Sequence, residues 1–313
     1  MRQPGTNRES YDIGFDQAVD MAMSCVIPMA SEMVSPALAA GRACAETLYA
    51  AVDSPSLDVS VKDGYAVVSA DLTNASRNNP ITLQIIDSVS AGGQSSAVVS
   101  RGKAIQVLSG APIPVGADAV LAEEFAEPGN DVIRAVADAE PGRNILRQGI
   151  DVAAGETLVE AGRELTPSII GRLVGGGISE VPVHQRPRVG LLGTGDEVLL
   201  PGSTPQAGKL FASNLALQQA WFSSRGIQAE ARVAGDSMES LTRAVQEMLP
   251  ESDVIITSGG AWKGNRDLIV TVLESLGWEL KFHRVRMGPG KAVGMGLLEG
   301  KPVFCLPGGP PSN

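Results

Sequence analysis

The sequence predicts a multidomain α/β protein in which a three-layer α/β domain with a mostly parallel sheet accompanies a mixed α+β linker domain and an inserted, small β-rich module. The chain has 313 residues, more than one ordinary compact domain needs, and 43% of them are hydrophobic, enough to bury a substantial core. Short β-branched runs fill the region 54–140, and strand and helix patterns alternate from about Arg186 onward. We therefore place the linker domain at 1–53 and 141–180, the inserted module at 54–140 and the three-layer domain at 181–313.

Helical spacing of apolar residues marks both segments of the predicted linker domain. From Phe15 to about Tyr49 the pattern predicts two helices with a kinked join near Pro28 and Pro36. A further helix is expected from Pro167 to about Val174, because proline suits the first turn of a helix. A chain that leaves these helices for a β excursion and then returns would build one domain from two segments.

Four apolar runs separated by Gly, Pro and Asn turns predict the strands of the inserted module. They cover residues 65–68, 81–86, 104–108 and 119–122. After residue 186 the pattern changes to strands at 189–193, 229–233, 254–257 and 303–306, with helices at 214–224, 238–249 and 267–276. Such alternation predicts a parallel sheet covered by helices, with ligand-binding loops at the carboxyl ends of the strands.

Three glycine-rich loops follow three of the predicted parallel strands. They read GTGDE (193–197), TSGG (257–260) and LPGGP (306–310). Glycine lets the backbone approach a ligand closely and direct N–H groups at phosphate oxygens, although a tight strand-to-helix turn needs glycine in any case. Three such loops at the ends of one sheet favour a shared ligand crevice.

Charged residues accompany these loops. Asp196, Glu197, Asp236 and Asp267 supply carboxylates that suit Mg²⁺, although Asp236 and Asp267 stand equally well as helix caps. Lys263, Arg266, Arg286 and Lys291 supply positive charge. Lys291 follows a Pro-Gly turn and either meets an oxyanion held there or is a solvated turn residue.

Composition excludes several other functions. The formal net charge of −10 argues against a nucleic-acid partner, and residues 181–313 hold 13 Lys and Arg against 12 Asp and Glu, so an anionic small molecule is steered toward this part. Three scattered cysteines and two histidines lack the spacing of a zinc site or a disulfide framework. No apolar run is long enough to span a membrane and no signal pattern opens the chain, so we expect a cytoplasmic protein.

Five segments together resemble the MoeA/gephyrin-E family of molybdopterin molybdenumtransferases. VKDGYA (61–66) is similar to the family's MDGYA, and LSGAPIPVGADAV (108–120) to its TGAPIPxGADAV. TGDE (194–197), TSGG (257–260) and PGK (289–291) resemble three more family segments, in the same order along the chain. The two N-terminal segments separate this family from the single-domain MogA type, which resembles only residues 181–313.

The resemblance implies insertion of molybdate into adenylylated molybdopterin, with Mg²⁺ assisting and AMP released. It implies a homodimer whose cleft lies between the β-rich module of one subunit and the MogA-like domain of the other, and a MogA-type adenylyltransferase as a partner. Catalytic roles are implied for Asp63, Asp196, Glu197 and Asp267, of which the last three also suit the metal. Binding of the pterin nucleotide is implied for Thr194, Gly195, Ser258, Gly259, Gly260, Lys263, Lys291, Pro307 and Gly308.

The departures from the family pattern fall close to these positions. Where the family has GGVSVGDYD, this chain reads GGAWKGNRD (259–267), which replaces an acid by Asn265 and adds Lys263 and Arg266. PGKP becomes PGKA at Ala292, LPGNP becomes LPGGP at Gly309, and the methionine before DGYA is Lys62. The family continues beyond the position of Asn313 into a helix and a small β-barrel domain.

Two functions from different classes follow. The first is an active molybdotransferase, favoured by Asp63, Asp196, Glu197 and Asp267. The second is a catalytically impaired paralogue that acts as a pterin-binding or scaffolding subunit, favoured by the altered turn at Asn265, where one acid is lost.

Overall fold

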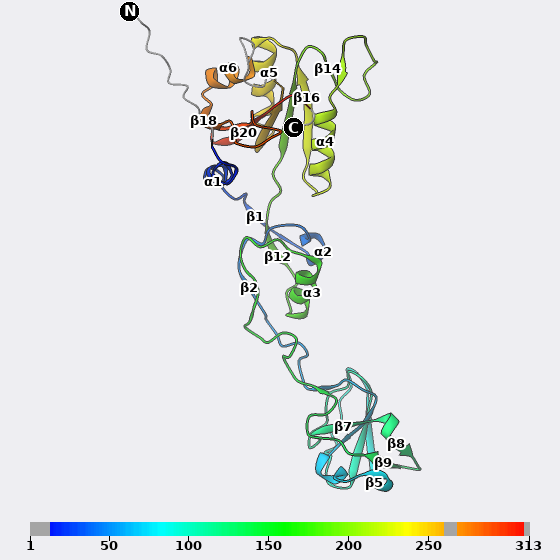
Figure 1. Cartoon of the computed structure of the whole chain (residues 1–313). Helices are drawn as coiled ribbons and strands as arrows, with labels where there is room; N and C mark the ends of the chain where they lie inside the picture. Colours follow the sequence, from blue (N-terminus) through cyan, green and yellow to red (C-terminus); the bar gives the residue numbers. More distant parts are fainter. Residues whose placement is uncertain (1–12, 260–267, 310–313) are drawn as a thin grey trace, which may run out of the picture. The chain divides into compact units, whose positions relative to one another are not determined.

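The computed structural model describes residues 13–259 and 268–309 and divides the chain into two compact units. One unit is Glu32–Val183; the other joins the segment before it to the segment from His184 onward. Figure 1 shows the course of the chain through both.

The first unit contains a β-rich module with a mixed sheet. The strand order is β7-β4-β6-β5-β9-β8, with β5 and β6 parallel and the other pairs antiparallel. The elements are β4 (Gly64–Val67), η1 (Ser69–Leu72), β5 (Ser76–Val89), β6 (Lys103–Val107), β7 (Ala119–Ala122), η2 (Glu123–Phe125), β8 (Ala126–Pro128) and β9 (Val132–Ala137). Each of the four predicted runs is a strand, and the β8–β9 hairpin adds two that the prediction omits.

Alternating side chains of this sheet fill two cores. Tyr65 and Val67 join Leu83 on one face, whereas Ala66 joins Ile105 on the other. Gly64 pairs with both β6 and β7, and a Cβ at this position would lie 2.1 Å from the carbonyl oxygen of Leu121. The close approach of β7 therefore requires the glycine of the VKDGYA segment.

The rest of this unit is a small helix-and-strand layer with a core of its own. Its elements are β1 (Ser31–Val34), α2 (Pro36–Ala39), β2 (Leu48–Tyr49), β3 (Val59–Ser60), β10 (Ile145–Leu146), β11 (Thr157–Val159), α3 (Pro167–Gly175) and β12 (Val181–His184). The expected helix α3 is confirmed: Thr166 caps it by accepting from the Ile169 amide, and Pro167 follows. The prediction of a second N-terminal helix is wrong except for the single turn of α2. The residues on either side of α2 form β1 and β2, which pair with β12 and β11.

The second unit is a three-layer α/β structure. Its strand order is β16-β13-β17-β20-β19-β18, in which the first four strands are parallel and β19 is antiparallel to both neighbours. The strands are β13 (Val189–Thr194), β16 (Ala229–Ala234), β17 (Val254–Ser258), β18 (Glu279–His283), β19 (Gly294–Leu298) and β20 (Lys301–Leu306). The helices are α1 (Phe15–Cys25), α4 (Ser213–Ser223), α5 (Met238–Met248) and α6 (Leu268–Ser275).

Helices cover both faces of this sheet, as a parallel sheet requires (Figure 1). Helices α5 and α6 pack on the face that carries Leu192 and Cys305. Helix α4 packs through Leu215 on the opposite face, beside Leu191. The strands predicted for this region are confirmed, whereas β18 and β19 are additions at one edge.

Helix α1 differs from its expected place. The sequence predicts it in the linker domain, but Ala18 packs against Phe282 and Met295 on β18 and β19. Residues 284–286 and Ile13 exchange backbone hydrogen bonds, which fix the start of the helix beside the sheet. The helix covers apolar sheet surface that α4 does not reach, and this burial decides its position.

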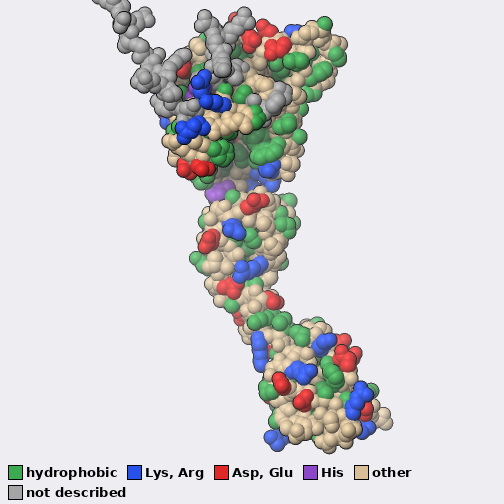
Figure 2. Space-filling view, viewed as in Figure 1, with side chains coloured by type: hydrophobic (Ala, Val, Ile, Leu, Met, Phe, Trp, Pro, Cys, Tyr) green, Lys and Arg blue, Asp and Glu red, His purple; other side chains and the backbone are tan. Residues whose placement is uncertain are grey.

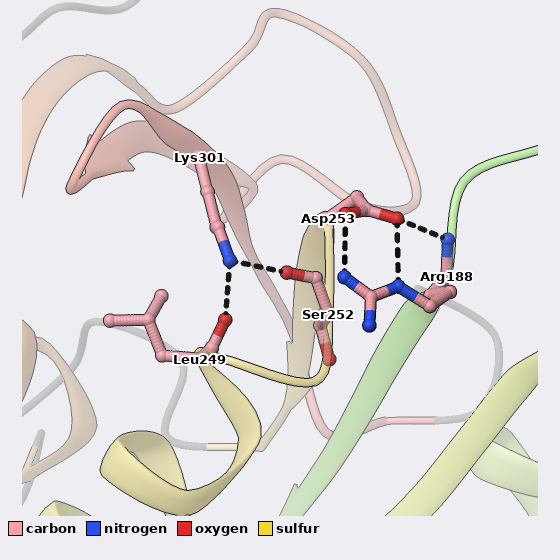
Figure 3. Close-up of polar contacts among 5 residues, drawn as sticks. All are labelled: Arg188, Leu249, Ser252, Asp253 and Lys301. Carbon is pink, nitrogen blue, oxygen red and sulfur yellow. Dashed lines mark hydrogen bonds and ion pairs between the residues drawn. The ribbon is translucent and has the colours of Figure 1, made fainter. Parts of the chain in front are cut away.

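Polar contacts stabilise the amino ends of the parallel strands (Figure 3). The Arg188 guanidinium binds both carboxylate oxygens of Asp253 and holds the pKa of that carboxyl below its ordinary value. The Lys301 ammonium donates to the carbonyl oxygens of Leu249 (2.6 Å) and Ser252 (2.9 Å), just after α5 ends. A cation at the C-terminus of a helix satisfies carbonyls that have no partner within the helix. These contacts tie α5 to β17 and β20.

We predict that Lys301→Met lowers the free energy of unfolding of this unit by about 1–3 kcal/mol, because two carbonyls lose a charged donor. Urea unfolding followed by tryptophan fluorescence measures this unit alone, since all three tryptophans lie after residue 184. Lys281→Met is the matched control: Lys281 pairs with Glu279 at 3.2 Å on the surface, and the change should cost less than about 1 kcal/mol. Equal losses in both variants would contradict the assignment.

Candidate functional site

The carboxyl ends of the parallel strands lie at one end of the sheet. Between β13 and β17, the direction in which the chain moves across the sheet reverses. From β13 the chain runs outward to β16 at one edge, and from the neighbouring β17 it runs to β18 at the other edge, so the connections that follow these two strands go in opposite directions. Such a switch point leaves a crevice between the strand ends, where α/β proteins bind ligands. The predicted loops after β13, β17 and β20 all lie at this edge.

Close backbone approaches bring these loops together. A Cβ at Gly259 would lie 2.4 Å from Thr194 Oγ1 and 2.8 Å from the Thr194 carbonyl oxygen, and one at Gly308 would lie 3.2 Å from Gly259 Cα. Gly195 and Gly259 have φ values of 142° and 120°, in the region that favours glycine. The glycines are thus required both by the backbone conformation and by the contact between neighbouring strand ends.

A cavity of about 420 Å³ opens at this edge. This volume lies within the range of roughly 300–1,000 Å³ typical of small-molecule sites. The residues that line it come from the strand ends, the start of α4 and two short paired strands, β14 (Val198–Leu199) and β15 (Leu210–Phe211). They are Gly193, Thr194, Gly195, Glu197, Val198, Leu210, Phe211, Ala212, Ser213, Asn214, Leu215, Asp236, Ser258, Gly259 and Gly308. The predicted binding residues Thr194, Gly195, Ser258, Gly259 and Gly308 are therefore brought together in one cavity.

The N-terminus of α4 forms one wall. Ser213 and Asn214 begin this helix and line the cavity. Asn214 Nδ2 donates to Ser258 Oγ at 3.1 Å and to the Gly308 carbonyl at 3.0 Å, which links α4 to the loops after β17 and β20. The first N–H groups of a helix have no partner within it and favour an anion. The wall thus combines helix N–H groups and hydroxyls beside the glycine loops.

Acidic side chains belong to the cavity lining as well. Glu197 and Asp236 line it, whereas Asp196 lies just outside the lining. The Asp236 amide donates to Asp196 Oδ1 at 3.0 Å, and the Lys209 ammonium donates to the Asp196 backbone oxygen. Asp196 therefore joins the loop after β13 to the loop after β16. In the described ranges, no three His, Cys, Asp or Glu side chains form a metal-binding group.

Asp63 lies in the other unit and has a local structural contact. Its carboxylate accepts from the Ser109 amide at 2.6 Å, and its backbone oxygen accepts from the Glu123 amide at 3.0 Å. The side chain is exposed. Asp63 thus connects the VKDGYA segment to the LSGAPIP segment, which explains their joint presence in the module.

The remaining predicted residues lie away from the cavity lining or outside the description. Lys291 is exposed in the connection between β18 and β19, at the same edge of the sheet but beyond β20. Pro307 is buried between β20 and Gly308. Gly260, Lys263 and Asp267 lie outside the described residues, as do Asn265 and Arg266.

Several lining residues were missed as site residues. Ser213 and Asn214 are an ordinary helix start in the sequence, and only their place next to the loops reveals a role. Asp236, which the sequence offers both as a carboxylate beside the loops and as a cap for α5, does not cap that helix, because Ser237 fills that position by accepting from the Ser240 amide at 3.1 Å. Leu210 and Phe211 lie on a two-residue strand that is too short for a pattern to predict.

Comparisons with known proteins match both parts of the chain. Residues 13–177 match the model described as MoeA N-terminal region (domain I and II), and residues 190–312 match a probable molybdopterin binding domain. A crystal structure of a molybdopterin biosynthesis MoeA protein from Pyrococcus horikoshii is 33% identical with a TM-score of 0.80, and the alignment covers 96% of this chain and 76% of that chain.

Two curated relatives cover most of the chain. Molybdopterin molybdenumtransferase of Bacillus subtilis is 32% identical over 278 residues, 86% of this chain and 64% of the relative. Molybdopterin molybdenumtransferase 2 of Mycobacterium tuberculosis is 32% identical over 264 residues, 82% and 65%. The chain thus spans a little under two thirds of the length of these relatives.

We predict that Gly259→Ala destabilises the second unit more than Gly277→Ala does. Gly277 also has a left-handed φ, of 91°, but an added Cβ would meet no atom within 4 Å, so its cost is the backbone strain of about 1–2 kcal/mol. At Gly259 the clash with Thr194 comes in addition and forces β13 and β17 apart. Urea unfolding by tryptophan fluorescence compares the two. A Gly259→Ala cost no larger than the control would show that the strand ends do not need this contact.

Proposed function

Because the chain belongs to the MoeA family, we propose that it acts in molybdenum cofactor biosynthesis by inserting molybdate into adenylylated molybdopterin with release of AMP. The observation that carries this proposal is the cavity in which the glycine loops after β13, β17 and β20 meet the N-terminus of α4. Its volume, N–H donors and hydroxyls suit a phosphorylated ring compound. The similarity to two molybdenumtransferases favours an enzyme over a binding subunit.

The cavity residues suggest how AMP leaves. AMP release breaks a phosphoanhydride bond, so negative charge grows on the departing phosphate. Ser213, Asn214 and the first N–H groups of α4 would hold that phosphate, and these donors need no rearrangement to do so.

We propose Mg²⁺ at the acidic side of the cavity. Glu197 lines the cavity and supplies the oxygen ligands that Mg²⁺ prefers, and Asp196 and Asp267 are its proposed companions. When bound, the ion would offset the charge of the phosphate oxygens. Without it, Glu197 and Asp236 would repel an anionic ligand.

We further propose a homodimer whose cleft combines Asp63 of one subunit with the cavity of the other. Asp63 and Glu197 lie in different units of the chain. Helix α1 turns Phe15, Val19 and Met23 outward, 58%, 42% and 66% exposed, which is an apolar face suited to a second copy.

The proposed partner and cellular location follow from the proposed substrate. A MogA-type adenylyltransferase would supply adenylylated molybdopterin, and a cytoplasmic location remains a prediction. Nucleic acid is not a proposed partner: in the view of Figure 2, positive and negative side chains are interspersed over the β-rich module. In the described ranges, no helix has the length and apolar composition that crossing a bilayer requires.

The activity is tested with adenylylated molybdopterin, molybdate and Mg²⁺, with AMP quantified by chromatography. The unaltered chain should release AMP, and Glu197→Gln should slow release at least tenfold, because it removes a carboxylate from the cavity. Glu274→Gln, an exposed change on α6, is the control and should leave release unchanged. Absence of release from the unaltered chain would favour the impaired paralogue instead.

Mixing two variants tests the shared cleft in the same assay. Asp63→Asn and Glu197→Gln should each be inactive, whereas subunits exchanged between them form heterodimers with one intact cleft. Random exchange should then recover about a quarter of the unaltered activity. Recovery at background level, with dimers verified by light scattering, would argue against a cleft shared between subunits.

A further inference from the structure

The cavity has an apolar side that the phosphate chemistry does not use. Leu210, Phe211 and Val198 form this apolar part of the lining. Leu210 is 65% exposed and Phe211 47% exposed, although each would gain about 1.5–3 kcal/mol on full burial. Two large apolar side chains exposed within a ligand cavity indicate a ligand surface that covers them.

Backbone pairing holds these side chains in place. They form β15 (Leu210–Phe211), which pairs in parallel with β14 (Val198–Leu199). The Leu210 amide donates to the backbone carbonyl oxygen of Glu197 at 2.7 Å, and the Ala212 amide donates to that of Leu199 at 2.8 Å. The connection between the two strands is exposed throughout, and Lys209 fastens its end to the Asp196 backbone oxygen. The apolar side is therefore attached directly to the loop that carries Glu197.

The order of residues sets the apolar and the anion-binding parts side by side. Phe211 is followed by Ala212, which is buried, and then by Ser213 and Asn214 at the start of α4. A ligand whose phosphate meets the N-terminus of α4 thus places its neighbouring group beside Phe211. Aromatic side chains bind flat ring faces with about 1–3 kcal/mol per ring.

We infer that Phe211, supported by Leu210, stacks on a flat heteroaromatic ring of the anionic ligand and makes this chain select ring-bearing over ring-less phosphates. The inference rests on the proposed function for the identity of the ligand, whose pterin and adenine are both such rings. Phe211 is a specificity-determining residue in this account. The hydroxyls of the α4 wall bind the anion whether or not a ring is attached.

Isothermal titration calorimetry tests the inference with three probes: pterin-6-carboxylate, AMP and pyrophosphate. Phe211→Ala should weaken the affinity for at least one of the two ring-bearing probes roughly tenfold, and Phe211→Trp should restore that affinity. The affinity for pyrophosphate, which has no ring, should change less than about twofold. If the affinity for pterin-6-carboxylate depends on Phe211, the stacked ring is the pterin; if only the affinity for AMP does, it is the adenine.

Leu217→Ala is the matched control, because Leu217 is a large apolar residue of α4 that is also exposed, at 64%, but does not line the cavity. The inference is overturned if Leu217→Ala loses as much affinity as Phe211→Ala, if pyrophosphate weakens in parallel, or if neither ring-bearing probe binds the unaltered chain. AMP release from adenylylated molybdopterin is measured separately. If release is absent while ring binding depends on Phe211, only the proposed activity fails; if release occurs while ring binding ignores Phe211, only this inference fails.

Discussion

The contact between Gly259 and Thr194 determines how the site is built. The ends of β13 and β17 lie so close that a methyl group at Gly259 would overlap Thr194 Oγ1. With the strand ends at this distance, Asn214 reaches both Ser258 and Gly308, and the N-terminus of α4 becomes a wall of the cavity. The sheet that carries these strand ends has both faces covered, as parallel sheets do. Helices α5 and α6 cover one face, and α4 with α1 covers the other.

Charge in the cavity follows from this arrangement. Glu197 and Asp236 line the same cavity as the N-terminus of α4 and the hydroxyls of Thr194, Ser213 and Ser258. The N–H groups and hydroxyls would hold an anion, and the proposed divalent cation between the anion and the carboxylates would reconcile the two signs. Asp196 also serves the framework, because its Oδ1 atom accepts from the Asp236 amide. Of the acidic pair in the TGDE segment, Glu197 thus lines the cavity, and Asp196 joins the loops beside the proposed ion.

The sequence predicts the parallel strands and their glycine loops well, because buried β-branched runs and strand-end glycines are local features. It predicts less where packing partners decide. Helix α1 has an amphipathic pattern, but the pattern does not say which sheet its Ala18 face covers. Residues 31–34 and 48–49 look helical by spacing and become strands because β12 and β11 offer partners. Phe211 and Asn214 carry no signal of their own, since their roles depend on neighbours distant in sequence.

The central claim is that the ligand occupies the cavity at the ends of β13, β17 and β20. Hydrogen–deuterium exchange with and without adenylylated molybdopterin tests it most directly, because bound ligand protects the amides that it contacts or stabilises. The account predicts slower exchange in the segments 193–198, 210–215 and 257–259, with little change at the amino ends of the same strands, around Arg188 and Lys301. Protection confined to other segments, with these three unchanged, would contradict it.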